Sequence, residues 1–126
     1  MGVVFTHRGS FSKLEKFLKN YDTRKLVPIL EQYGGLGVQA LSRATPALSG
    51  ITASAWSFNA GIDGRGLFIE WTNNSVIRTG VPIVILLYYG HGTRQGGYVK
   101  GHDFITPAIQ PVFDQIADAV WREVTR

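Results

Sequence analysis

The C-terminal segment carries the feature that most constrains the fold, a wide apolar stripe at helical spacing. From Thr106 or Pro107 to about Val124, apolar residues recur every three or four positions, and polar residues occupy the opposite face. Pro111 interrupts this segment, so regular hydrogen bonding is expected only after it. The stripe predicts one long amphipathic helix, whose buried face comprises Ile105, Ile109, Val112, Phe113, Ile116, Ala117, Val120, Trp121 and Val124.

Two further helices are predicted in the N-terminal third, after a short β-like run at Gly2–Thr6. The first covers Lys13–Asn20 and is capped by Ser10 or Ser12; the second begins at Asp22 or Thr23 and ends at about Arg43. The second has the spacing of an amphipathic helix, but three glycines each lower its intrinsic helix stability by ~1 kcal/mol relative to alanine. Their presence indicates close packing against another backbone, or a kink, at Gly34, Gly35 and Gly37.

The centre of the chain predicts a β-hairpin over about residues 51–72. Ile51–Ala60 is rich in β-branched and aromatic residues, a turn cluster follows at 61–66, and Leu67–Trp71 alternates as a returning strand. Val76–Thr79 fits a short strand or a loop. The hairpin is the clearest β-signal in the sequence.

The apolar run Pro82–Tyr89 is too short for periodicity to separate a buried helix from a central strand. We favour a helix because Gly90 would end it naturally. Tyr98–Lys100 predicts a last strand, near residues 97–101, paired close to the hairpin. The expected fold is therefore α+β in one domain over residues 1–126: a small antiparallel sheet packed with two N-terminal helices and a long C-terminal helix.

Composition limits the class of protein. With 126 residues, the chain is long enough for one core, and its charged fraction of 17% is below a typical ~25%. The low charge fits either a partly covered surface or ordinary variation among small domains. There are no cysteines, no secretory-signal pattern, and no apolar run near the ~20 residues of a membrane helix, so we expect a soluble protein without membrane partners.

The glycine-rich stretch from Tyr88 to Pro111 is the natural place to look for chemistry, since specific work often lies on loops held by ordered elements. His91, His102 and Asp103 could contribute to a metal or hydrolytic site, but their spacing matches no helical or hairpin ligand pair. The chain has no Gly-x-Ser-x-Gly elbow, and the glycines are not followed by the Lys-Ser/Thr of a phosphate loop. We expect no enzyme, no cofactor and no metal.

A nucleic-acid-binding module is an alternative. The net charge is +4, and residues 1–43 carry seven Lys/Arg against three acids. Such a basic half could contact phosphate, and exposed tyrosines could stack on bases. The residues that could do so are Arg8, Lys13, Lys16, Lys19, Arg94 and Lys100 with Tyr88, Tyr89 and Tyr98. A solvated basic helix face accounts equally for the charge of residues 1–43, and such aromatic residues also complete a core or a protein interface.

Three short motifs in order resemble a known family. Thr45-Pro46, Ser49-Gly50 and Ala55-Trp56 form the first; Tyr89-Gly90-His91-Gly92-Thr93 forms the second; Phe104-Ile105-x-Pro107-Ala108 forms the third. Together they are similar to the tail-completion, or head–tail joining, proteins of long-tailed bacteriophages, often described as minor capsid or minor tail proteins. Two positions depart from that pattern: Gly90-His91 replaces an acid, and Asp103 stands where proline is common.

The resemblance implies a structural virion protein at the phage neck, made in the bacterial host cytoplasm. It also implies a ring homo-oligomer, a hexamer by analogy, between head-connector and tail-tube proteins. We expect Gly90–Asp103 and the Thr45–Gly50 loop to face neighbouring subunits. The residues expected at this interface are Thr45, Pro46, Ser49, Gly50, Tyr89, Gly90, His91, Gly92, Thr93, Arg94, Tyr98, Lys100, His102 and Phe104.

Overall fold

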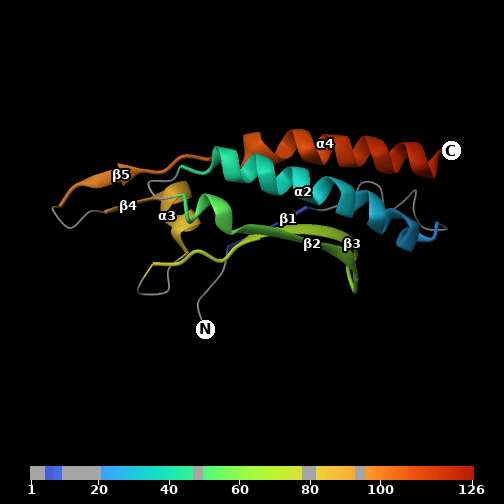
Figure 1. Ribbon diagram of the computed structural model, residues 1–126, viewed down its shortest axis with the longest axis horizontal. Coiled ribbons are helices and arrows are strands. Elements are labelled where there is room, and N and C mark those ends of the chain that lie inside the picture. Colours follow the sequence, from blue (N-terminus) through green and yellow to red (C-terminus); the bar gives the residue numbers. More distant parts are fainter. Residues whose placement is uncertain (1–4, 10–20, 47–49, 78–81, 93–95) are drawn as a thin grey trace.

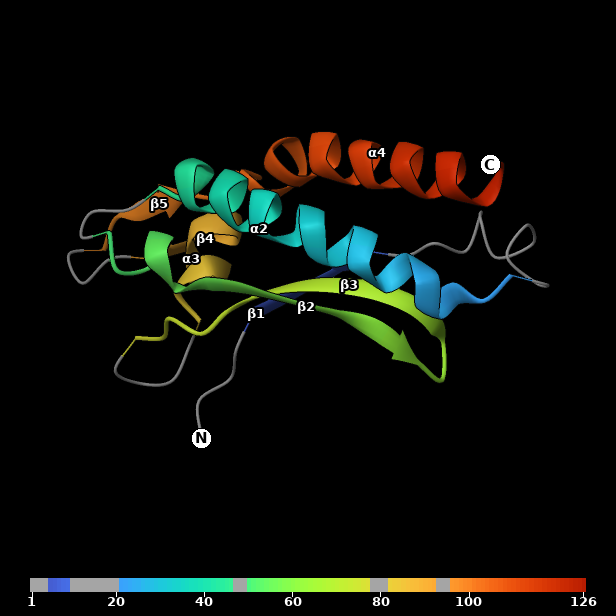
Figure 2. The ribbon, with the colours of Figure 1, turned by 45° about the vertical axis from the view of Figure 1, so that its right-hand side comes forward.

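The structure is a computed structural model that describes residues 5–9, 21–46, 50–77, 82–92 and 96–126 (Figure 1). Within them the chain has the expected α+β architecture, in which two long helices lie over one face of a three-stranded sheet. A smaller two-stranded ribbon extends from one end of this body (Figures 1 and 2). The predicted helix over Lys13–Asn20 lies outside the described residues.

The main sheet has the strand order β1-β3-β2, and all its pairs are antiparallel. β1 comprises Phe5–Gly9, β2 comprises Trp56–Asp63 and β3 comprises Gly66–Asn73. The last two form the predicted hairpin, which closes through a tight turn in which the Arg65 amide donates to Asp63 Oδ1 over 2.8 Å. Leu67, Ile69 and Trp71 of β3 are buried, as the sequence alternation predicts, and the strand continues to Asn73, which is also buried.

The first hairpin strand starts later than predicted. Residues 51–55 form a turn and a short 3₁₀ helix, η2 (Ala53–Ala55), instead of a strand. The Ser54 hydroxyl and amide both donate to the Gly50 carbonyl, which closes the chain into a turn before Trp56. The strand also continues through the predicted turn cluster as far as Asp63. Local serine hydrogen bonding here outweighs the β-propensity of the neighbouring residues.

The second N-terminal helix is confirmed. It begins as the 3₁₀ helix η1 (Thr23–Leu26) and continues as α2 (Val27–Ala44). Asp22 caps it, since its Oδ1 accepts from the Arg24 amide over 3.2 Å. α2 lies on the sheet, and Figures 1 and 2 show α4 (Ile105–Val124) running antiparallel along its outer side.

The glycines of α2 allow the helix to approach the sheet closely. A Cβ at Gly34 would overlap the Phe58 ring, and a Cβ at Gly37 would overlap the Trp71 indole. The Trp71 indole N–H also donates to the Gly34 carbonyl over 3.0 Å. The close packing expected from the sequence is therefore present, but the partners are aromatic side chains of the sheet and not another backbone. Gly35 faces open space.

The C-terminal helix follows the predicted stripe, with two differences. It is continuous from Ile105, and Pro111 is accommodated on an exposed surface inside the helix. Trp121 is 45% exposed, so it lies at the edge of the stripe. The fully enclosed positions of α4 are Ile105, Ile109, Val112, Ile116 and Val120. They share one core with Leu30 and Leu41 of α2 and with Ile69 and Trp71 of β3.

The remaining elements form the end of the molecule from which the ribbon extends. α3 (Ile83–Tyr89) is a helix, as favoured from the sequence, and Val76 makes a single bridge to Pro82. The predicted last strand, β5 (Tyr98–Lys100), exists, but it pairs with β4 (Gly90–Gly92) and not near the hairpin. Among the described residues, no helix is long and apolar enough to cross a membrane.

Candidate assembly interface

The ribbon begins at the C-terminal end of α3, where Gly90 ends the helix. Gly90 has φ 87°, a left-handed conformation that favours glycine, and its amide donates to the Leu86 carbonyl. The chain therefore leaves the helix abruptly and continues as β4. The sequence predicted the helix end at Gly90 correctly, but it treated Gly90–Gly92 as part of a glycine-rich loop, whereas these residues form a strand.

The ribbon pairs Gly90 with Lys100, His91 with Val99, and Gly92 with Tyr98. Tyr98 of the ribbon and Tyr89 at the adjoining end of α3 lie largely in solvent, since each is 68% exposed. The Tyr98 hydroxyl donates to the Tyr89 carbonyl over 3.1 Å, which links the second strand to the end of α3. Tyr89 also meets Tyr88 edge-to-face, with ring centroids 4.7 Å apart. These contacts order the ribbon while leaving most of its aromatic surface uncovered.

The base of the ribbon is fixed by a close backbone crossing. A Cβ at Gly101 would overlap backbone atoms of Tyr88, Tyr89 and Gly90. Immediately afterwards, the His102 amide donates to the Leu87 carbonyl over 3.1 Å. The returning strand therefore passes directly against the end of α3, which only a residue without a side chain permits. Sequence reasoning gave Gly101 no role.

Asp103 turns the chain from the ribbon into α4. Its Oδ1 accepts from the amides of Ile105 over 3.1 Å and Thr106 over 3.0 Å, at the start of the helix. The hydrogen bond from the Thr106 amide is the main reason that the pKa of Asp103 lies below its usual value. The negative charge of Asp103 in turn raises the pKa of the Tyr88 phenol. The sequence placed the helix start at Thr106 or Pro107 and overlooked this cap.

Two of the predicted interface residues lie in the core. Thr45 is 6% exposed; its hydroxyl donates to the Leu41 carbonyl and accepts from the Trp56 indole N–H over 2.8 Å. Phe104 is 4% exposed and belongs to the hydrophobic core. Their placement at a subunit surface is therefore wrong: one joins α2 to β2, and the other anchors the start of α4.

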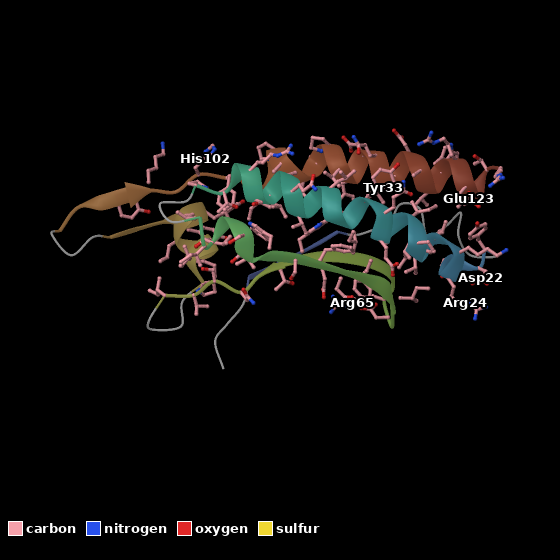
Figure 3. All side chains as sticks on the ribbon, viewed as in Figure 1. Asp22, Arg24, Tyr33, Arg65, His102 and Glu123 are labelled. Atoms are coloured by element: carbon pink, nitrogen blue, oxygen red, sulfur yellow. The ribbon has the colours of Figure 1, made fainter. Side chains whose placement is uncertain are left out.

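The other predicted interface residues fall into three groups. Five are exposed on the ribbon and near its base, namely Tyr89, Gly92, Tyr98, Lys100 and His102, and Gly90 there is half-buried. Figure 3 shows His102 at that end of the molecule, away from Arg65 and Asp22. Pro46 and Gly50 are exposed on the loop after α2, where Gly50 has φ 76°. Ser49, Thr93 and Arg94 lie outside the described residues, and only the backbone of His91 is described.

An open hollow of about 500 Å³ lies where α2 ends and α4 begins. Arg43 and His102, both exposed, are its basic residues, and its other lining residues are Ala40, Ala44, Phe104, Pro107 and Ala108. The described residues contain no group of three or more His, Cys, Asp or Glu side chains that could hold a metal. Oδ1 of Asp103 accepts both hydrogen bonds at the helix start, and the neighbouring His102 also contributes to lowering the Asp103 pKa.

Comparison with known proteins adds no relative: no family model, no curated protein and no solved structure matches this chain.

Proposed function

We propose that this protein is a structural component of a tailed-phage virion, acting at the neck as a tail-completion or head–tail joining protein. The observation that carries the proposal is the β4–β5 ribbon, which projects from the helix-covered body (Figure 1). Tyr98 of the ribbon and Tyr89 at the end of α3, beside its base, are each 68% exposed. The ordered motifs over residues 45–108, which resemble that family, support the same reading.

The ribbon has the physical properties of a contact element. Tyrosine combines a large apolar ring with a hydrogen-bonding group, and it is enriched in the buried centre of protein interfaces. The described strands of the ribbon are also held at their base by the Gly101 crossing and by the amide of His102, so these strands have little order to gain on docking. A pre-ordered aromatic projection is better suited to joining proteins than to enclosing a substrate.

The proposed assembly is a ring of identical subunits, hexameric by the resemblance, between head-connector and tail-tube proteins. In such a ring each subunit uses one patch on one neighbour and a different patch on the other. The ribbon supplies one of these patches. The proposal assigns no catalytic role to any residue.

Native mass measurement of the purified full chain tests the proposal. We expect a defined multiple of the 13.9 kDa subunit at micromolar concentration. Tyr98→Lys should shift the protein toward monomer, because it replaces exposed aromatic surface with a charge. Tyr98→Phe is the matched control and should retain most of the assembly.

Two results would argue against joining. One is a wild-type protein that stays monomeric at every concentration, and the other is a phage particle lacking the protein that still attaches tails normally. The nucleic-acid alternative stays a prediction, since the side chains of Arg8, Lys13, Lys16 and Lys19 lie outside the described residues. DNA affinity that falls steeply with salt would favour it.

A further inference from the structure

The open hollow where α2 ends and α4 begins carries two basic side chains. Arg43 comes from the last turn of α2, and His102 comes from the segment between β5 and α4. Neither side chain forms an ion pair or a hydrogen bond with any part of the chain that the structure describes. The described lining residues of the hollow include no acid. Two sets of hydrogen-bond donors therefore line a space that these residues leave open.

Asp103 offsets only part of this basic character. It follows His102 in the chain and interacts with it electrostatically, but it does not line the hollow. Its Oδ1 already accepts hydrogen bonds from the amides of Ile105 and Thr106. The Arg43 guanidinium is charged at physiological pH, and His102 offers a ring N–H in either protonation state. The hollow therefore keeps donors suited to an anionic group.

The remaining lining residues are apolar, and most of them are small. Ala40 and Ala44 belong to α2, and Pro107 and Ala108 belong to the start of α4. Phe104, which is part of the core, completes the lining. With such short side chains around it, the hollow of about 500 Å³ has room for an apolar side chain beside a charged one.

The shape and lining of the hollow favour an acidic polypeptide over other anions. Sites for small molecules bury roughly 70–90% of the ligand's surface, whereas an open hollow leaves one side of its occupant uncovered. A docked polypeptide covers that side with the rest of its own fold. Surfaces for single-stranded nucleic acid combine a track of cations with exposed aromatic rings, but this hollow is lined by alanines and a proline, and its one aromatic residue, Phe104, is buried.

We propose that the hollow receives an acidic segment of the protein to which this subunit is joined, in which an aspartate or glutamate lies next to a small apolar residue. The carboxylate accepts hydrogen bonds from Arg43 and His102, and the apolar side chain packs on the alanines. This inference rests on the proposed function, because the occupant is one of the joined partners. A partner that docks on the ribbon also reaches the hollow, since His102 directly follows the crossing at Gly101.

Selection with a display library of short random peptides on the immobilised full chain tests the proposal. We expect the enriched peptides to share an aspartate or glutamate beside alanine, valine or leucine. A synthetic peptide of the enriched sequence should bind Arg43→Gln about tenfold more weakly than the wild type, and Arg43→Glu more weakly still. A peptide in which lysine replaces the acid should bind Arg43→Glu more tightly than it binds the wild type.

Arg65→Glu is the matched control, because it makes the same change of charge at an exposed position on the hairpin turn, away from His102 (Figure 3). It should leave the affinity for the peptide unchanged. Urea unfolding of each variant checks that the fold is intact. Because Arg43 is exposed and has no side-chain partner in the described chain, its variants should unfold at the midpoint of the wild type.

The inference is overturned if no peptide is enriched, if the enriched peptides lack acids, or if they bind wild type and Arg43→Glu equally. A lower native mass of Arg43→Glu alone would also overturn it, by showing that a second copy occupies the hollow. Binding of an oligo-dT strand that Arg43→Glu abolishes would do so as well, by showing a nucleic-acid site. An oligomeric wild type that selects no acidic peptide refutes only this inference, whereas a monomeric chain that binds acidic peptides through Arg43 refutes the ring and keeps the peptide site.

Discussion

Replacement of Gly37 by alanine tests how α2 is held against the sheet. In a solvent-exposed helix this change is stabilising, since alanine is favoured over glycine by ~1 kcal/mol. Here the added Cβ would overlap the Nε1, Cε2 and Cζ2 atoms of Trp71. The indole is completely buried, and its N–H is engaged by the Gly34 carbonyl. The ring therefore cannot move aside without breaking that bond or displacing the helix.

The expected magnitude follows from three terms. Overpacking of a filled core costs about 1–3 kcal/mol. Weakening the Trp71 hydrogen bond destabilises the fold by about 1 kcal/mol, whereas the higher helix propensity of alanine stabilises it by about 1 kcal/mol. Gly37→Ala should therefore lower the free energy of unfolding by roughly 2 kcal/mol. Gly35→Ala, two residues away and with no atom within 4 Å of its Cβ, should raise it by roughly 0.5–1 kcal/mol.

Urea unfolding of the three proteins, at one fixed protein concentration, measures both changes. The midpoints should move in opposite directions while the slope with denaturant stays constant. Trp71→Phe provides a further control: its smaller ring should reduce the cost of Gly37→Ala, which makes the double variant more stable than the sum of single effects. If Gly37→Ala proves as stable as wild type, or Gly35→Ala is equally harmful, the packing explanation is refuted.

Three other predictions test the site and its supports. Gly101→Ala should lower both the stability of the fold and the degree of assembly, because the added Cβ would overlap backbone atoms at the base of the ribbon. The control Gly64→Ala, with no atom within 4 Å of its Cβ, should change neither. Thermal melting measures the stability, and native mass measurement measures the assembly. Thr45→Val should lower the free energy of unfolding by about 1–2 kcal/mol, because it removes the hydroxyl that accepts from the Trp56 indole N–H. The control is Thr125→Val at an exposed position. A urea midpoint for Thr45→Val equal to that of the wild type would contradict this prediction. Asp103 has a lowered folded-state pKa, so its stabilising contribution is present above its unfolded pKa, near 3.8, and is lost as the pH falls through the lower folded value. As the pH is lowered from about 7 to about 2, the melting temperature of Asp103→Asn should therefore fall less steeply than that of the wild type. Parallel curves for the two proteins would contradict a stabilising role of the Asp103 carboxylate at the start of α4.

Local patterns were reliable where one face of an element is buried. The stripe of α4 predicted a long helix because every third or fourth residue enters one core. The alternation of Leu67, Ile69 and Trp71 predicted the returning strand for the corresponding reason. At Ile51–Ala55, composition favoured a strand, but side-chain hydrogen bonds from Ser54 closed a turn. Propensity alone could not weigh those bonds.

The candidate interface was predicted only in outline. The sequence identified the glycine-rich stretch, and exposed Tyr89 and Tyr98 do lie there. It could not separate surface from core within its residue set, because Thr45 and Phe104 are buried by elements distant in the chain. Nor could it find the partner of β5, since strand pairing depends on how the end of α3 directs β4.

The sequence by itself determined the periodic elements, the helix end at Gly90 and a helix start at Asp22 or Thr23, because each depends on residues within a turn or two of one another. Tertiary structure alone decided what the glycines do. Gly34 and Gly37 allow aromatic rings of the sheet to pack closely against α2, and Gly101 allows the chain to pass against the end of α3. A Cβ at Gly35 would have no atom within 4 Å. Those differences come from atoms brought together across tens of residues, and spacing along the chain does not encode such contacts.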